Sequence, residues 1–337
     1  MSLSPSFVAH RRGWIMPAAA LALLLAVSLP VAPVAAPRIA HAAFLALLPV
    51  PMGCVLLLLV HALTGGEWGR SARPALLAGA GYLPFVCCLA LPPLLFMPSV
   101  FLWAGSPELI AKADAARFYF SAPALALRTL VTLGLWNGLA VFVIRRERPS
   151  PALAGFCLLV FGVSVSTAGV DWVLALAEPL RSTAFPMSLA ISFLLAGAAF
   201  AGGSATGERA EDWAKLTATF ALGLTYLDAM QFLVAYDGNL PEQARWYGAR
   251  GGWVLSLLGL AFLLAALLPV LTVFRKSWRR APEVRRALAV AVPVGVGLRA
   301  LWFAVPSWEP GALFWLLLLV LLSATAALPI LAGGQRA

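Results

Sequence analysis

Long apolar runs are the feature that most restricts how this chain can fold. About ten runs, rich in Leu, Ala, Val and Phe, follow one another along the sequence, and each has the roughly 20 residues that a helix needs to cross the hydrocarbon core of a bilayer. Backbone polar groups in lipid must be hydrogen-bonded within the segment itself, so each run is expected to be a helix and not an open strand. The sequence therefore predicts an all-α integral membrane protein with about ten transmembrane helices.

The predicted spans occupy the whole chain and leave no stretch long enough for a separate soluble domain, so residues 1–337 are expected to form a single polytopic membrane domain. The first run, from Trp14, follows His10, Arg11 and Arg12 as a secretory signal would, but it is longer than a usual signal core and a second run follows at once. We therefore expect it to be the first membrane helix. The predicted spans, to within a few residues at each end, are 14–35, 40–63, 74–97, 121–144, 151–175, 183–204, 214–237, 251–274, 285–305 and 311–334.

Composition excludes several classes of protein. Of the 337 residues, 62% are hydrophobic and only 11% are charged, which is too little charge to cover a soluble domain. The net charge of +10 would indicate a nucleic-acid partner in a soluble protein, but here it is typical of cytoplasmic loops, and no nucleic-acid partner is expected. The four cysteines lie in apolar runs without a CxxC spacing, so they are interpreted as small buried hydrophobes and not as a disulfide framework or metal site.

The distribution of cations predicts the orientation. Of the 24 Lys and Arg residues, two lie within spans and six lie in the segments that face outside if the N-terminus is cytoplasmic, which leaves 16 in the cytoplasmic segments. This bias places both termini in the cytoplasm, and we expect a multi-pass protein of the bacterial inner membrane. The six outside cations are Arg38, Lys112, Arg117, Arg181, Arg245 and Arg250. The outer loops 98–120 and 237–250 are predicted to hold short interfacial helices.

Four charged residues remain inside the predicted spans: Arg128, Asp171, Asp228 and Arg299. A charge at the bilayer centre costs roughly 2.5–3.5 kcal/mol even on insertion scales, so each is expected to have a partner or a function. The rise of 1.5 Å per residue places all four roughly 8–13 Å below the outer surface. We expect them to approach one another near the outer third of the bundle, with Arg128 and Arg299 holding Asp171 ionised or orienting a quinone carbonyl, and with Asp228 and Asp171 handling protons.

Two interpretations of these charges stay open. In the first they line a polar cavity, a quinone pocket or a proton relay, together with Gln231, Tyr226 and His61. In the second they form two structural ion pairs, or the arginines snorkel to the surface. Polar faces at helical spacing, such as Ser164, Thr167 and Asp171, fit either proton transfer or ordinary interhelical hydrogen bonding.

The sequence offers few residues that could ligate a redox cofactor. The histidines are His10, His41 and His61, and the last two stand at opposite ends of one predicted span, roughly 30 Å apart by helical rise. A bis-histidine haem is therefore not expected, and no Cys or His cluster predicts a metal site. Walker, GxSxG and dinucleotide motifs are also absent from the sequence.

Several short motifs resemble one family. The stretch 171–186, DWVLALAEPLRSTAFP, contains an Asp-Trp pair, then Glu178-Pro179, then Ser182-Thr183. Further along come Gln231-Phe232, the block Asn239-Leu240-Pro241-Glu242, Trp246-Tyr247, and Leu298-Arg299 with Trp302 and Pro306. Arg128 and the His61–Gly66 stretch HALTGG also match. Over roughly residues 40–335 the chain resembles the F-type quinone-binding membrane subunit of alternative complex III, within the polysulfide-reductase NrfD-like group. It departs from that pattern by one residue before Glu178 and in the missing aromatic after Pro179.

The resemblance implies an architecture and a set of partners. It implies two four-helix bundles plus two peripheral helices, and a complex with multihaem cytochrome c, iron–sulfur and C-type membrane subunits that oxidises quinol. The expected function is thus that of a cofactor-free, non-redox membrane subunit of a quinol:cytochrome c oxidoreductase, with a quinone pocket or a proton half-channel. The alternatives are a proton-coupled secondary transporter, which inverted repeats would favour, and a purely structural membrane anchor.

Overall fold

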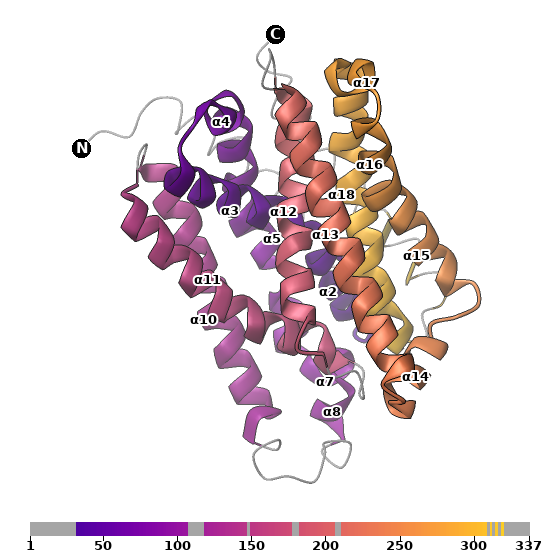
Figure 1. Cartoon of the computed structure of the whole chain (residues 1–337). Helices are drawn as coiled ribbons and strands as arrows, with labels where there is room; N and C mark the ends of the chain where they lie inside the picture. The colour runs from indigo at the N-terminus through magenta and orange to yellow at the C-terminus, as the bar shows by residue number, and fades with distance from the viewer. Residues whose placement is uncertain are drawn as a thin grey trace.

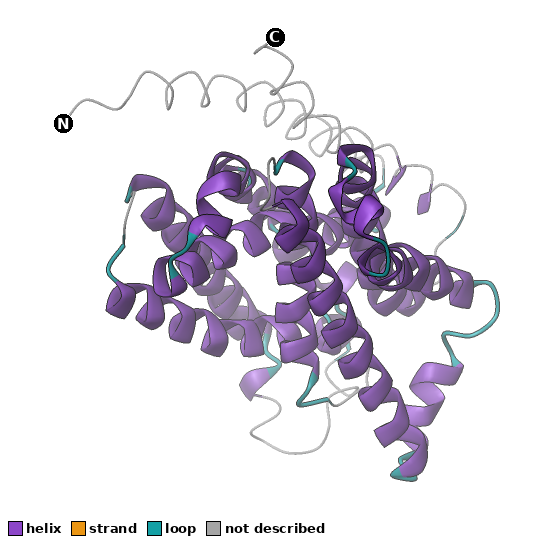
Figure 2. Cartoon of the chain, turned by 45° about the horizontal axis from the view of Figure 1, so that its top comes forward, coloured by secondary structure: helices purple, strands orange, loops and turns teal. Residues whose placement is uncertain are grey.

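The structure is a computed structural model that describes residues 32–106, 118–146, 149–176, 182–205 and 210–308, together with 311, 314, 315, 318 and 319. Every regular element in these residues is a helix, which confirms the predicted fold class (Figure 2). Within the described residues, 8 helical segments are long and apolar enough to cross a membrane. They correspond to the second to ninth predicted spans. The first and tenth, 14–35 and 311–334, fall largely outside the described residues, so the count of about ten stays a prediction.

The first four of the eight membrane-crossing segments are built from the following helices. The first combines α2 (Ala35–Leu47) and α3 (Pro49–Thr64), and the second combines α4 (Glu67–Gly81), α5 (Leu83–Cys88) and α6 (Leu91–Leu95). Two short helices follow, α7 (Met97–Val100) and α8 (Leu102–Gly105). The third segment is α10 (Ala122–Arg145), and the fourth is α11 (Pro151–Trp172), which ends in the 3-10 turn η2 (Leu174–Leu176).

The second half of the chain continues in the same way. It contains α12 (Phe185–Ser204), α13 (Ala210–Asp237) and the short α14 (Pro241–Gly248). The next segment is α15 (Val254–Phe262), the π-helical η3 (Leu263–Leu267) and α16 (Leu268–Val273). After α17 (Lys276–Arg280) comes α18 (Pro282–Ala304), which ends in η4 (Val305–Trp308).

Proline decides where the broken segments divide. Pro84 occupies the first turn of α5, and Pro92 and Pro93 occupy the first turn of α6, where the missing N–H is not needed for the helix ladder. Each proline therefore begins a new helix instead of continuing the previous one. In the later segment, Pro269 is the second residue of α16, which follows the π-helical η3 directly.

The helices pack around α12, which contacts α3, α18 and α13 most extensively. In addition, α3 packs against α4 and α11, and α10 packs against α11 and α4; α13 packs against α16, and α18 packs against α15. The division into two four-helix bundles that the resemblance implies stays a prediction.

Glycine brings α3 and α12 together. A Cβ atom on Gly53 would lie 1.8 Å from the carbonyl oxygen of Phe193, and one on Gly197 would lie 2.5 Å from the carbonyl carbon of Gly53. Only glycine fits at this crossing, as is common where membrane helices approach closely.

The connecting elements gather at the two ends of the bundle. Figure 1 shows α4 and α17 at one end, and α7, α8 and α14 at the other. The first end carries the loops predicted to be cytoplasmic, and the second carries those predicted to be outside. The helix α14 confirms a short helix in 237–250. In 98–120 the described part contains α8, while residues 107–117, which include Lys112 and Arg117, lie outside the described residues.

Candidate functional site

The first buried ion pair joins α10 to α11. Arg128 donates from Nε to Oδ2 of Asp171 at 2.8 Å and from Nη2 to Oδ1 at 2.9 Å. Asp171 is only 2% exposed. Arg128 also donates to the carbonyl oxygen of Tyr119 at 2.9 Å and lies 3.8 Å from the centre of the Tyr119 ring. The pair is therefore a bidentate contact covered by an aromatic side chain.

The second ion pair joins α18 to α13. Arg299 donates from Nε to Oδ2 of Asp228 at 2.5 Å and from Nη2 to Oδ1 at 2.6 Å. On α12, the hydroxyl of Ser188 donates to Asp228 Oδ1 at 2.7 Å and accepts a hydrogen bond from Arg299. The Arg299 guanidinium also lies 4.9 Å from the centre of the Phe303 ring. Three helices thus meet around one carboxylate.

Hydrogen bonds link the four buried charges in two pairs, Arg128 with Asp171 and Arg299 with Asp228. Arg299 is bonded to Asp228, so the expectation that both arginines hold Asp171 is wrong. The error arose because depth in the membrane gives the level of a charge but not its lateral position. This geometry matches the second interpretation, two ion pairs, and it gives each carboxylate a fixed cationic partner.

A small cavity adjoins the second pair. Arg299, Ser192, Trp172 and Phe185 are among its lining residues, and its volume is about 20 Å³. That is room for about one water molecule, and it is too small for a quinone ring. Because Arg299 lines it, the cavity lies beside the Arg299–Asp228 pair.

Gln231 extends the polar site toward the outer end of α13. It lies one turn beyond Asp228, accepts a hydrogen bond from the Ser182 hydroxyl at 2.6 Å, and donates to the carbonyl oxygen of Leu227 at 3.2 Å. Tyr226, by contrast, is 61% exposed. The structure therefore joins Gln231 to the site and leaves Tyr226 on the outer surface of α13.

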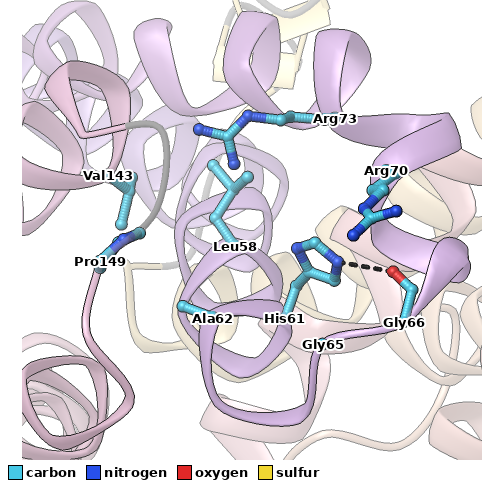
Figure 3. Close-up of a pocket in the computed structure, with 9 residues that line it drawn as sticks. All are labelled: Leu58, His61, Ala62, Gly65, Gly66, Arg70, Arg73, Val143 and Pro149. Carbon is cyan, nitrogen blue, oxygen red and sulfur yellow. Dashed lines mark hydrogen bonds between the residues drawn. The ribbon is translucent and has the colours of Figure 1, made fainter.

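His61 does not belong to this site. It stands near the end of α3, with Nε2 2.9 Å from the carbonyl oxygen of Gly66 and its ring 5.3 Å from that of Trp68. It lines a different pocket of about 230 Å³ with Arg70 and Arg73, drawn in Figure 3. This pocket is at the end of the bundle that is predicted to be cytoplasmic, whereas the ion pairs lie in the predicted outer half.

Sequence reasoning missed three contributors to the outer end. Tyr119 and Ser188 complete the two ion pairs, and Arg250, one of the six outside cations, is only 3% exposed. Arg250 donates to the carbonyl oxygens of Trp246 and Phe303 and to Ser307, and it stacks 3.5 Å from the Trp246 ring. Burial lowers the pKa of Arg250 to about 9, which still leaves it charged at neutral pH. The spacing of Ser188 and Ser192, four residues apart on one helical face, was the available signal for α12.

The motifs behind the family resemblance occupy defined positions. Asn239 adopts a left-handed conformation, with φ of 49°, where α13 ends, and Pro241 begins α14. Asparagine and proline suit these two positions. The ring of Trp246 then lies 5.6 Å from that of Trp302, and the ring of Tyr247 lies 5.3 Å from that of Phe232. Glu178, Pro179 and Arg181 lie outside the described residues.

Metal ligands do not gather in the part of the chain that the structure describes, because no group of three or more His, Cys, Asp or Glu side chains there could hold an ion. His41 is buried and bonds through Nε2 to the carbonyl oxygen of Trp172 at 2.8 Å. Its role there is that of a packed, hydrogen-bonded core residue.

Comparison of the chain with models of protein families and with curated proteins finds no match. Any functional assignment therefore depends on the geometry of the site and on the sequence motifs.

Proposed function

We propose that the chain is a cofactor-free membrane subunit of a quinol-oxidising respiratory complex of the quinol:cytochrome c oxidoreductase type, located in a bacterial inner membrane. Its own contribution is a proton half-channel in the outer half of the bundle, built around Asp228. Electron transfer takes place in partner subunits, which carry multihaem cytochrome c and iron–sulfur centres, next to a C-type membrane subunit.

The observation that carries this proposal is that the motifs shared with the family contact one another. Arg128 bonds to Asp171, Ser182 bonds to Gln231, and Trp246 packs against Trp302. These residues come from stretches far apart in the sequence, and no two of the paired residues are neighbours along the chain. Buried charges such as Arg128 and Asp171 would pair in any bundle, so the Ser182–Gln231 and Trp246–Trp302 contacts are the ones that favour the resemblance.

The order of polar groups supports a proton path. Ser192 and Arg299 line the one-water cavity, Ser188 bonds to Asp228, and Gln231 bonds to Ser182. Hydroxyl and amide groups on facing helices can pass protons when water joins them, and intramembrane carboxylates commonly mark such relays. The path runs from the cavity toward the outer end of α13.

The surface of the described helices leaves room for partners. Only 17% of the most apolar stretch of Val254–Val273 is buried within the chain, and 28% of that of Ala210–Asp237. Such faces contact lipid or the helices of another membrane subunit. Large side chains such as Phe232 and Phe262 lie on them.

Purification under mild conditions tests the proposal. The full chain, tagged and produced in the cells that naturally make it, should be extracted with a gentle detergent and analysed by mass spectrometry and visible absorbance. We expect subunits with c-type haem and iron–sulfur centres to co-purify with the chain, together with quinol-oxidising activity. Once the partner subunits have been dissociated, we expect the isolated chain to show no haem absorbance. A chain that purifies alone and moves a solute across liposomes would overturn the proposal in favour of a secondary transporter.

A further inference from the structure

A second polar pocket lies at the opposite end of the bundle from the ion pairs. It has a volume of about 230 Å³ and opens between α3, α4 and the chain around Val143 and Pro149. In Figure 3, the guanidinium groups of Arg70 and Arg73 stand on two sides of the His61 ring. The function proposed above makes no use of these residues.

Cationic groups dominate the polar part of this pocket. Arg73 donates to the carbonyl oxygen of Arg146 at 3.3 Å, and Arg70 forms an ion pair with Glu67 at the surface. A guanidinium carries five N–H donors, so each arginine keeps donors beyond these contacts. Glu67 offsets part of the charge of Arg70, and Arg73 is therefore the stronger anion-binding group.

The backbone around the pocket adds to its positive potential. Gly65 and Gly66 have φ angles of 66° and 91° and lead directly into α4, a helix of 15 residues. The N-terminus of a helix presents backbone N–H groups and favours negative charge. Gly69 lies one turn later, where a Cβ would come within 2.2 Å of the His61 ring, so the glycine makes room for that ring in the wall.

The rest of the wall is apolar. Leu58, Ala62, Val143 and Pro149 line it, and α3, α4 and α10 all begin or end here at the membrane boundary. A pocket with cations on one side and hydrocarbon on the other fits a molecule that has a phosphate at one end and acyl chains at the other. Basic pockets between membrane helices on the cytoplasmic side are suited to anionic lipid head groups.

We propose that this pocket binds the phosphodiester of an anionic phospholipid, with Arg73 and Arg70 contacting the phosphate and with the glycerol and first acyl carbons against Leu58 and Ala62. The site belongs to the chain by itself and does not depend on a respiratory partner. A free phosphate ion shares the charge chemistry but not the apolar contacts.

Native mass spectrometry of the full chain tests the site. The chain should be delipidated in detergent and titrated with phosphatidylglycerol, with zwitterionic phosphatidylethanolamine, and separately with inorganic phosphate. We expect at least a fivefold preference for phosphatidylglycerol, the loss of most of that preference in Arg73→Gln, and no change in Lys276→Gln, which removes an exposed cation from the same end of the bundle.

A second variant that leaves the charge unchanged separates a loss of lipid binding from a loss of folding. Ala62→Phe fills the apolar side of the pocket without altering charge, so it should also weaken phosphatidylglycerol binding while the helical circular dichroism stays unchanged. Phosphatidylglycerol binding that is equal in wild type, Arg73→Gln and Ala62→Phe would overturn the proposal. Competition by inorganic phosphate at similar concentration, or equal binding of both lipids, would also overturn it by showing a site for phosphate alone or no head-group selectivity.

Discussion

Arg299 on α18 and Asp228 on α13 form a bidentate ion pair across 71 residues of sequence, with both N–O distances at or below 2.6 Å. Ser188 on α12 bonds to both partners. The side chain of Arg299 is 6% exposed, and that of Asp228 is 29% exposed. The carboxylate is thus partly accessible, while the arginine is enclosed.

The Arg128–Asp171 pair is expected to stabilise the fold. Asp171→Asn leaves a guanidinium without its anion, and breaking a buried pair in this way costs about 3 kcal/mol. The melting temperature in detergent should fall clearly. The double variant Arg128→Met with Asp171→Leu removes both charges and should recover much of the loss. An Asp171→Asn variant with the melting temperature of the wild type would contradict a stabilising role for the pair.

The crossing of α3 and α12 is expected to tolerate no side chain larger than hydrogen. Gly197→Ala forces its Cβ into the backbone at Gly53, and overpacking of this kind costs about 1–3 kcal/mol. The matched control is Gly162→Ala on α11, where a Cβ meets nothing within 4 Å. Thermal unfolding followed by size-exclusion fluorescence should separate the two variants. Equal melting temperatures would argue against the close crossing.

Arg250 is expected to hold the outer ends of α14 and α18 together. Its hydrogen bonds to Trp246, Phe303 and Ser307 and its stacking on Trp246 are lost in Arg250→Met. A hydrogen bond to a charged group contributes about 1.5–3 kcal/mol net to stability. Arg245→Met, at an exposed position on the same short helix, is the control and should have the melting temperature of the wild type. Similar melting of both variants would assign Arg250 no structural role.

The cation bias predicts the orientation in the membrane. Reporter fusions within Arg275–Arg286 should give a cytoplasmic signal, and fusions within 237–250 should give an outside signal. The structure places these segments at opposite ends of the bundle (Figure 1), so the two reporters must disagree. An outside signal from Arg275–Arg286 would reverse the orientation and with it the depth of every buried charge.

Hydropathy predicted the described spans well because lipid imposes one requirement on every segment, a length of apolar helix. Pairing of the charges was harder: depth follows from position along a helix, but the choice between Asp171 and Asp228 as the partner of Arg299 depends on which helices are neighbours. Without contacts between helices, depth alone could not assign the pairs.

Other errors had simpler causes. Tyr226 is two residues from Asp228, and residues at that spacing do not share a helical face, so periodicity could have excluded it. His61 belongs to the motif HALTGG and was counted with the site residues, although the predicted topology already placed it at the opposite end of the bundle from the ion pairs. Arg250 lies in a loop by sequence, and only the fold brings Phe303 and Ser307 over it.

The proposed role of Asp228 can be tested directly in the assembled complex. Quinol-linked turnover and proton release should be measured in proteoliposomes that contain the complex with wild-type chain, with Asp228→Asn, or with Asp237→Asn, an exposed acid at the end of the same helix. The account predicts that Asp228→Asn assembles with all partner subunits yet loses at least tenfold in turnover or its proton release, while Asp237→Asn behaves as the wild type. Wild-type turnover and proton stoichiometry in a fully assembled Asp228→Asn complex would contradict it and leave the Arg299–Asp228 pair with a structural role alone.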